Sequence, residues 1–308
     1  MLSRREILKL AGGALGGGAL SAKEPSLVFP ATPRERIAVA SYPFRAFIDN
    51  RAAPGSSDGK MPLTGFPAMV VERYGIHNVE LLGEHFPSIE AAYLKELREA
   101  LVTARCRLVN LPASPRASFY DPDAARRAAS VEESIRWVDA ARALDCPSVR
   151  LHIAGVRGVA ADVDRASDSL RKIAAYGEAH AIVINLENDD PKSEEAGFIV
   201  KLIERVNSPW LRGLPDFCNS MLIGPEQYNY DSMRAMFAHA YNISHVKDSE
   251  VDGGKVYRVD MGRTFQIAKA SGYRGYFSME WEGEGGPYEG TAKLIEMSLK
   301  SLGDGKSS

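Results

Sequence analysis

The sequence predicts an α/β protein with a single (β/α)8 barrel, in which eight parallel strands alternate with eight helices. Two features of the chain lead to this fold class. Short aliphatic and β-branched runs alternate with longer segments whose apolar residues recur every three or four positions, and the alternation repeats eight times after Arg34. Eight such units in about 275 residues match a closed barrel better than an open doubly wound sheet, and no GxGxxG motif follows the first strand.

Each predicted strand is a short, mostly apolar run, and each predicted helix has an apolar face. The predicted strands are residues 37–42, 78–82, 107–111, 148–153, 181–186, 211–215, 243–246 and 275–280. The predicted helices are residues 66–74, 89–103, 124–144, 163–180, 194–206, 225–240, 261–271 and 289–302. A Gly-, Pro- and Ser-rich loop at residues 51–65 is long enough to form a lid or a substrate-facing insert. One TIM barrel at residues 31–303 is therefore expected, followed by a polar tail at residues 304–308.

The overall composition is that of a globular protein. Of the 308 residues, 45% are hydrophobic and 25% are charged, and the net charge is -2. This balance and the lack of a basic run argue against a nucleic-acid partner bound through its phosphates. Cys106, Cys146 and Cys218 are widely spaced and odd in number, so they form neither a disulfide framework nor a CxxC zinc site. We expect them to be buried thiols.

Residues 1–30 have the pattern of an export signal and a linker. The pair Arg4-Arg5 follows Ser3 and precedes the apolar, Gly- and Ala-rich run LAGGALGGGALSA, which ends in small residues near Ala22. This pattern resembles a twin-arginine (Tat) signal peptide, with a disordered tail as the alternative. The resemblance implies export of a folded protein by the Tat machinery to the periplasm. The run is too short and too glycine-rich for stable membrane insertion.

Four ionisable residues stand at the ends of the last four predicted strands. They are Glu187, Asp216, His245 and Glu280, and the intervals of 29, 29 and 35 residues each span one strand–helix unit. Strand ends of this kind meet at the C-terminal mouth of a barrel, where active sites lie. Any one of the acids alone could be a surface residue. Three carboxylates and an imidazole at one mouth would need a cation between them, so the spacing predicts a divalent-metal site. Oxygen and nitrogen ligands suit manganese first, with magnesium, cobalt or zinc as alternatives.

Three local motifs add a family resemblance to this pattern. They are VELLGEHFP at residues 79–87, HVKD at 245–248 and GYFSMEWEG at 275–283. With the four strand ends, they resemble the xylose isomerase-like barrel superfamily of sugar isomerases and epimerases, and in particular its tagatose/psicose 3-epimerase-like members. The resemblance covers nearly all of the chain after the signal. It implies that Glu187, Asp216, His245 and Glu280 bind one metal ion. It also implies that Glu187 and Glu280 are the catalytic acid and base on opposite faces of a sugar.

The chain departs from this family pattern at two positions. Asp189 stands where many members have His, and Asn219 stands where many have a His that helps to handle the substrate. We keep Asn219 as a predicted substrate-binding residue. Endonuclease IV-like relatives need further histidines for a multi-zinc site, so the six His of this chain argue against DNA repair.

Further candidates for substrate binding lie near the same strand ends. Glu80, His85 and His152 could hydrogen-bond sugar hydroxyls, and a structural role at the barrel rim is the alternative for each. Lys247, two residues after His245, could stabilise a developing oxyanion or form a salt bridge.

Aromatic residues at the strand ends offer stacking surfaces for a sugar. Trp281 and Phe44 are the predicted stacking residues, with core packing as their alternative, whereas core packing is favoured for Tyr42.

The sequence therefore predicts a metal-dependent sugar isomerase or epimerase that works through an enediolate and proton transfer between two glutamates. The first alternative is a lyase or hydratase acting on a keto-sugar or oxidised glycoside, which export from the cytoplasm favours. The second is a non-catalytic carbohydrate-binding barrel. A small-molecule carbohydrate is the expected partner in each case, and a homo-oligomer is compatible with the sequence.

Overall fold

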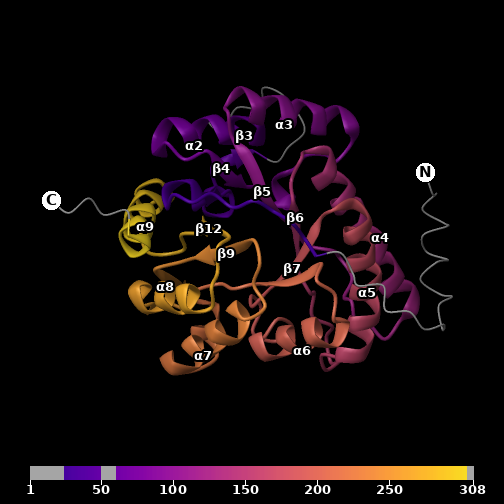
Figure 1. The fold of residues 1–308 in the computed structure, drawn as a ribbon. Helices are drawn as coiled ribbons and strands as arrows, with labels where there is room; N and C mark the ends of the chain where they lie inside the picture. Colours follow the sequence, from indigo (N-terminus) through magenta and orange to yellow (C-terminus); the bar gives the residue numbers. More distant parts are fainter. Residues whose placement is uncertain (1–23, 50–59, 304–308) are drawn as a thin grey trace.

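The strands and helices form a nearly closed barrel (Figure 1). The computed structural model describes residues 24–49 and 60–303. Eight strands pair in the order β8-β7-β6-β5-β4-β1-β12-β9, and each pairing along this sheet is parallel. At the seam between β8 and β9, two isolated bridges, Gly213–Ala240 and Asp216–His245, replace a continuous ladder. The predicted (β/α)8 barrel is confirmed.

The elements follow the predicted order of strand and helix. The barrel strands are β1 (Ile37–Ala40), β4 (Asn78–Glu80), β5 (Arg107–Ala113), β6 (Ser148–Leu151), β7 (Val183–Glu187), β8 (Leu211–Leu214), β9 (Ile243–Val246) and β12 (Tyr276–Met279). The helices around them are α2 (Phe66–Tyr74), α3 (Ala91–Thr103), α4 (Ala124–Ala143), α5 (Val163–His180), α6 (Ala196–Val206), α7 (Glu226–Phe237), α8 (Met261–Ala270) and α9 (Pro287–Leu302). The largest shift at a strand start is at β7, because Ala181 adopts φ 58° and ends α5.

Local residue choices fix several helix ends. The side chains of Asp123, Asp162 and Asp260 precede α4, α5 and α8, and each accepts a hydrogen bond from a backbone N–H of the first turn. Such caps satisfy donors that a helix leaves unpaired at its N-terminus. Gly75 and Gly303 follow α2 and α9 with positive φ, a conformation that glycine adopts without steric cost.

Two small sheets flank the barrel, and neither was predicted. One pairs β2 (Ile48–Asp49) with β3 (Met61–Pro62), on either side of residues 50–59, which lie outside the described part. Most of the predicted lid loop therefore remains untested. The other is an antiparallel hairpin of β10 (Ser249–Asp252) and β11 (Lys255–Arg258), joined by two glycines with φ of 55° and 78°. A two-residue Gly-Gly turn of this kind is a sequence signal for a hairpin.

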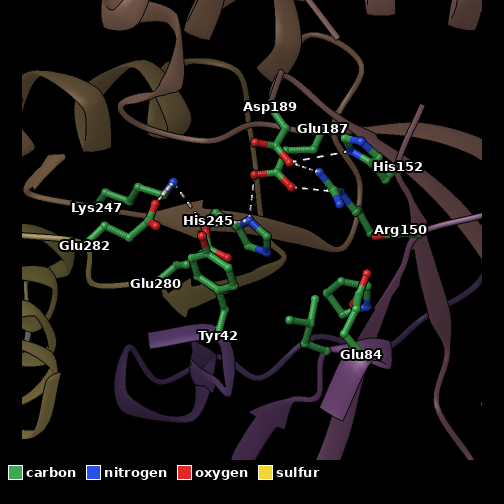
Figure 2. A pocket seen from close by; sticks show the side chains of 13 residues that line it. Tyr42, Glu84, Arg150, His152, Glu187, Asp189, His245, Lys247, Glu280 and Glu282 are labelled. Carbon is green, nitrogen blue, oxygen red and sulfur yellow. Dashed lines mark hydrogen bonds and ion pairs between the residues drawn. The ribbon is translucent and has the colours of Figure 1, made fainter. Parts of the chain in front are cut away.

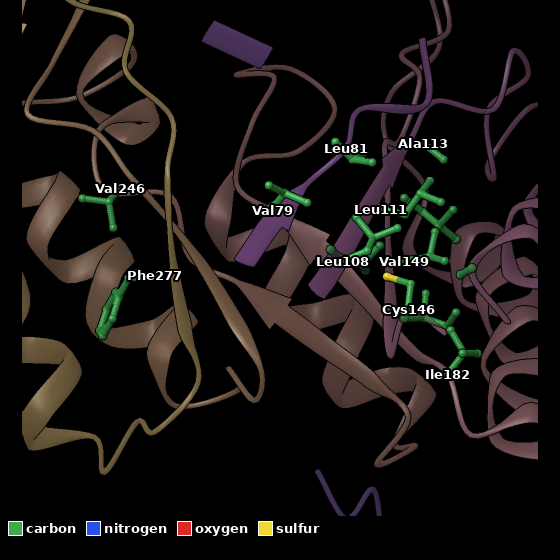
Figure 3. Close-up of a cluster of buried hydrophobic side chains, with 14 of the residues drawn as sticks. Val79, Leu81, Leu108, Leu111, Ala113, Cys146, Val149, Ile182, Val246 and Phe277 are labelled. Atoms are coloured by element: carbon green, nitrogen blue, oxygen red, sulfur yellow. The ribbon is translucent and has the colours of Figure 1, made fainter. Parts of the chain in front are cut away.

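The main hydrophobic core lies between the outer face of the strands and the helices. Val79, Leu111, Val149, Val246 and Phe277 from five strands belong to this core, together with apolar residues of the surrounding helices (Figure 3). Alternate residues of a strand point to opposite faces, so the residues between these positions point into the barrel. The three cysteines are buried and free, as predicted.

The barrel interior changes in polarity from bottom to top. Near the N-terminal ends of the strands, a small apolar cluster includes Val109, Ile243 and Tyr276. Above it lie fully buried amides and hydroxyls, among them Asn110 and Asn185. The ionisable residues of the site occupy the C-terminal mouth. Only the outer face of these strands is uniformly apolar.

Residues 24–29, within the segment predicted as signal and linker, pack onto the bottom of the barrel. Glu24 forms an ion pair with Arg212 at 2.9 Å. The Tyr241 hydroxyl donates to the Pro25 carbonyl at 2.8 Å and accepts from the Leu27 N–H at 2.9 Å. The Phe29 ring packs edge-on against Tyr241. The predicted signal itself lies outside the described residues. No helix in the described ranges has the length and apolarity needed to cross a membrane.

Candidate metal centre and active site

The four predicted ligands come together at the mouth of the barrel. Glu187 ends β7, Asp216 follows β8, His245 lies in β9 and Glu280 follows β12. Each offers one ligand atom, and these atoms all lie within 4.8 Å of one another. Their exposed fractions are 3%, 0%, 1% and 8%, so all four are removed from bulk water. Four residues that follow one another by one strand–helix unit each therefore meet at one point, as the sequence predicts.

Asp216 has one carboxylate oxygen without a hydrogen-bond partner. Its Oδ1 accepts from the backbone N–H of Cys218 at 2.8 Å and of Asn219 at 2.7 Å, which fixes the side chain. Its Oδ2 is fully buried and unpartnered, with Lys247 Nζ 3.6 Å away. Burial raises the pKa of Asp216 to about 7. A buried oxygen of this kind, beside two more carboxylates and an imidazole, fits a divalent cation.

His245 lies at the centre of the carboxylates. Its Nδ1 is 2.8 Å from Glu187 Oε1 and 3.2 Å from Glu280 Oε2, and its Nε2 is 3.0 Å from both oxygens of Glu80. Burial lowers the pKa of His245, but the three carboxylates outweigh it and hold that pKa well above the usual value.

The two candidate catalytic glutamates have opposite pKa shifts. Burial keeps the pKa of Glu187 raised, although His245 and Arg150 act against it. For Glu280, burial also raises the pKa, but His245 and Lys247 outweigh burial and lower it to about 2.

Lys247 is buried beside the candidate ligands. Its Nζ donates to Asn219 Oδ1 at 2.9 Å, pairs with Glu282 and lies 3.4 Å from Glu280 Oε2. Burial opposes its charge, but Asp216 and the neighbouring glutamates raise its pKa well above the usual value. Asn219, where many relatives have His, therefore holds this lysine.

Arg150 is a site residue that the sequence analysis missed. Its Nε lies 2.9 Å from Glu187 Oε2, as an ion pair that is not aligned for a hydrogen bond, and its Nη2 pairs with Asp189. The next inward residue, His152, places Nδ1 2.7 Å from Glu194 Oε2. Arg150 lies in β6 and His152 follows its last residue, two positions further on, so period-2 alternation could have assigned both to the mouth.

A cavity of about 320 Å³ opens beside these side chains. Figure 2 shows Lys247 and Glu282 on one side of it and Arg150, His152 and Asp189 on the other, with His245 between them. The residues lining the cavity are Tyr42, Leu82, Glu84, Pro112, Ser114, Arg150, His152, Glu187, Asp189, His245, Lys247, Glu280 and Glu282.

Two predicted substrate contacts are buried outside the cavity. Glu80 is 1% exposed and faces His245 and Asn110. His85 is 5% exposed, and its Nδ1 lies 3.0 Å from the Ser41 hydroxyl. Burial lowers the pKa of His85 to about 4, so its imidazole is neutral near pH 7. Neither side chain lines the cavity, which favours the alternative of a structural role for both.

The structure places the three aromatic candidates in different surroundings. Phe44 is fully buried in the core and packs edge-on against Phe66 and Tyr288, so it has no surface to offer a sugar. Tyr42 lines the cavity instead. Trp281 lies outside the cavity lining, against Gly290 of α9.

A protein-family model matches most of the chain. The model described as xylose isomerase-like TIM barrel matches residues 69–302. The chain belongs to this family. No curated protein sequence matches it significantly.

Solved structures of xylose isomerase-like barrels share the fold. The D-psicose 3-epimerase from Clostridium cellulolyticum H10 superposes with a TM-score of 0.64 at 14% identity, covering 87% of this chain and 96% of that one. A xylose isomerase-like protein from Mycobacterium smegmatis in complex with magnesium gives 0.67 at 16% identity, covering 89% and 100%. An L-ribulose 3-epimerase gives 0.66 at 14% identity, covering 89% and 99%. At such identities the likeness establishes the fold, and chemistry has to be argued from the site.

Proposed function

We propose that this xylose isomerase-like barrel is a divalent-metal-dependent sugar isomerase or epimerase. The observation that carries the proposal is the buried Asp216 Oδ2, which has no hydrogen-bond partner and faces a centre shared with Glu187, His245 and Glu280. The epimerases among the structural neighbours support the reaction class. Manganese, or else magnesium, cobalt or zinc, suits the ligand set, and the magnesium complex of one neighbour supports a hard divalent ion.

The side chains around the cavity can carry a proton transfer next to a carbonyl. A bound cation would supply Lewis-acid polarisation of that carbonyl, which acidifies the adjacent C–H. Glu280 and Glu187 both line the cavity and are the groups that remove and return the proton. Lys247 also lines it, and its ammonium can donate a hydrogen bond to the substrate oxygen on which negative charge develops.

The charges of the cavity favour an uncharged carbohydrate over a sugar phosphate. Arg150 is paired with Glu187 and Asp189, and His152 is paired with Glu194. Lys247 is surrounded by carboxylates. A phosphate group would have to displace a carboxylate from one of these pairs, which is costly where that carboxylate is buried, as Glu187 and Glu194 are.

One observation favours elimination as a second candidate. Arg150 engages Glu187 Oε2, an oxygen that proton transfer between two glutamates would use. His152 lines the cavity; burial lowers its pKa, but the hydrogen bond with Glu194 outweighs this and raises it, so the ring is an available acid. In a lyase, Glu280 would take the α-proton and the β-carbon–oxygen bond would break. His152 would then give its proton to the leaving oxygen.

Proton exchange with solvent tests the proposal. We expect Mn²⁺-loaded protein in D2O to place deuterium at the α-carbon of a neutral ketose or a 3-keto-glycoside, and product analysis then separates epimerisation from elimination. Glu280→Gln should abolish exchange, whereas Glu284→Gln, an exposed acid in the same loop, should retain it. Metal and sugar binding without exchange in any member of the panel would favour a non-catalytic carbohydrate-binding barrel.

A further inference from the structure

A chain of buried polar side chains runs through the barrel interior to His245. Asn110 Nδ2 donates to Glu80 Oε1 at 2.6 Å, and Glu80 faces His245 Nε2 with both oxygens at 3.0 Å. Below them, the Ser148 hydroxyl donates to Asn110 Oδ1 at 2.6 Å. Asn242 Nδ2 in turn donates to Ser148 Oγ at 2.8 Å. None of the five residues is more than 1% exposed, so water does not compete for these bonds.

The donor and acceptor roles in this hydrogen-bond network are fixed. Asn110 Oδ1 accepts from Ser148 and, at 3.4 Å, from Asn185 Nδ2, so the amide group of Asn110 cannot flip without losing both bonds. Its N–H therefore points at Glu80 and fixes that carboxylate as an acceptor. The only ring atom of His245 that faces Glu80 is Nε2, which must carry a proton to donate to it.

The opposite ring nitrogen of His245 faces the candidate ligands. Nδ1 lies 2.8 Å from Glu187 Oε1 and 3.2 Å from Glu280 Oε2, on the side where a cation would be held. A neutral imidazole has one protonated nitrogen and one lone pair, and only the lone pair can bind a metal. A proton held on Nε2 therefore leaves Nδ1 as the ligand atom.

We propose that Glu80 is a positioning residue that holds His245 as the Nε2–H tautomer and directs its Nδ1 lone pair at the metal, with Asn110 fixing Glu80 in turn. This rests on the proposed metal-dependent function. Glu80 then acts through His245 and has no contact with substrate. A carboxylate in this place also makes the imidazole a stronger ligand, and loss of such a partner typically weakens metal binding about tenfold to a hundredfold.

The tautomer can be measured on the wild-type protein. We expect a long-range ¹H–¹⁵N correlation spectrum of the Zn²⁺-loaded, ¹⁵N-histidine-labelled protein to show His245 with a protonated Nε2 and a coordinated Nδ1. The chain has six His, and loss of one signal set in His245→Asn assigns the residue. Coordination through Nε2 would overturn the proposal without any need for a Glu80 variant.

Variants of Glu80 test its role through Mn²⁺ affinity, measured by calorimetry. Glu80→Met should weaken binding about tenfold to a hundredfold and give mixed tautomers in the Zn²⁺ form. Glu80→Gln keeps one acceptor oxygen and should lose less. Asp121→Asn is the matched control, because this buried acid pairs with Arg126 and does not line the cavity, and it should leave His245 and the affinity unchanged.

Two further outcomes separate this inference from the proposed function. A folded Glu80→Met protein with wild-type affinity and tautomer would overturn the positioning role alone. Wild-type protein that binds neither Zn²⁺ nor Mn²⁺ would overturn the positioning role and the proposed function together.

Discussion

Individual charged residues determine what the mouth of the barrel can bind. Asp216 is anchored through one oxygen by two backbone N–H groups, and its other oxygen is buried without a hydrogen bond. Burying such an oxygen costs free energy, which a bound cation would offset. The nearby Lys247 cannot replace that cation in full, because its closer contacts are Asn219 and Glu282.

Asp216 should therefore link metal binding to stability. We expect Mn²⁺ to raise the melting temperature of the wild-type protein. At one hundred times the dissociation constant, the gain in unfolding free energy would be about 2.7 kcal/mol. Asp216→Asn should lose most of this gain, whereas Asp231→Asn, an exposed acid of α7, should keep it. Scanning calorimetry with and without Mn²⁺ makes the comparison. An equal shift in all three proteins would place the metal elsewhere.

His85 should make stability depend on pH in a defined window. Its pKa is lowered by burial to about 4, against about 6.5 in an unfolded chain. Between these values the unfolded state binds a proton that the folded state does not, so stability falls as pH falls from about 6.5 to about 4. We expect this fall to be smaller in His85→Gln by on the order of 1–3 kcal/mol, measured by urea unfolding at pH 7 and pH 4.5. Parallel curves for the two proteins would contradict the assignment.

At the scale of elements, the sequence predicts the order and the position of all the barrel strands, because hydrophobic periodicity is a local property. It fails where the chain leaves a regular strand. After β1 the backbone turns into the 3-10 helix η2 (Tyr42–Phe44), so strand alternation no longer applies, and Tyr42 faces the cavity while Phe44 enters the core.

The candidate ligands were predictable for the same reason that the strands were. Each ligand is the residue at the end of one strand, so its position follows from the strand alone. The buried hydrogen-bond network through Asn110 and Ser148 depends on which side chains meet across the barrel, and strand patterns do not give that. Arg150 was missed because only the last residue of its strand was considered.

The packed N-terminal segment should stabilise the barrel as an added element. Phe29 makes edge-on contacts with Tyr241 and Tyr276 at the bottom of the barrel. We expect Phe29→Ala to lower the unfolding free energy by about 1–3 kcal/mol, since two aromatic pairs are lost. Val28→Ala is the matched control, because Val28 is 91% exposed, and its effect should be below about 0.5 kcal/mol. Equal urea midpoints for the two variants would show that the segment adds nothing.

At the scale of the whole molecule, the two ends of the barrel have separate roles. The candidate site occupies the C-terminal mouth, and residues 24–29 lie at the opposite end. We propose that residues 1–30 direct Tat export to the periplasm. Residue 24 lies at the end of the barrel opposite the mouth, so export and the chemistry of the site would use different ends of the chain's fold.

Replacing the arginine pair tests the export proposal. We expect Arg4→Lys combined with Arg5→Lys to retain the protein in the cytoplasm, because the resemblance of residues 1–30 to a Tat signal depends on this arginine pair. Cell fractionation and immunoblotting of full-length protein measure the distribution, and Lys9→Arg is a control that should be exported normally. Unchanged export of the double variant would exclude the Tat route.

The candidate metal site lies at the junction between β8 and β9, so a bound ion would also affect how the barrel closes. β8 and β9 meet through isolated bridges, and one of these joins Asp216 to His245, two of the candidate ligands. A cation bound by both residues would cross-link the two strands at the junction that has no continuous ladder of hydrogen bonds. Binding of the ion would then hold β8 and β9 together. The backbone amides next to Asp216 and His245 would exchange with solvent more slowly than in the ion-free protein.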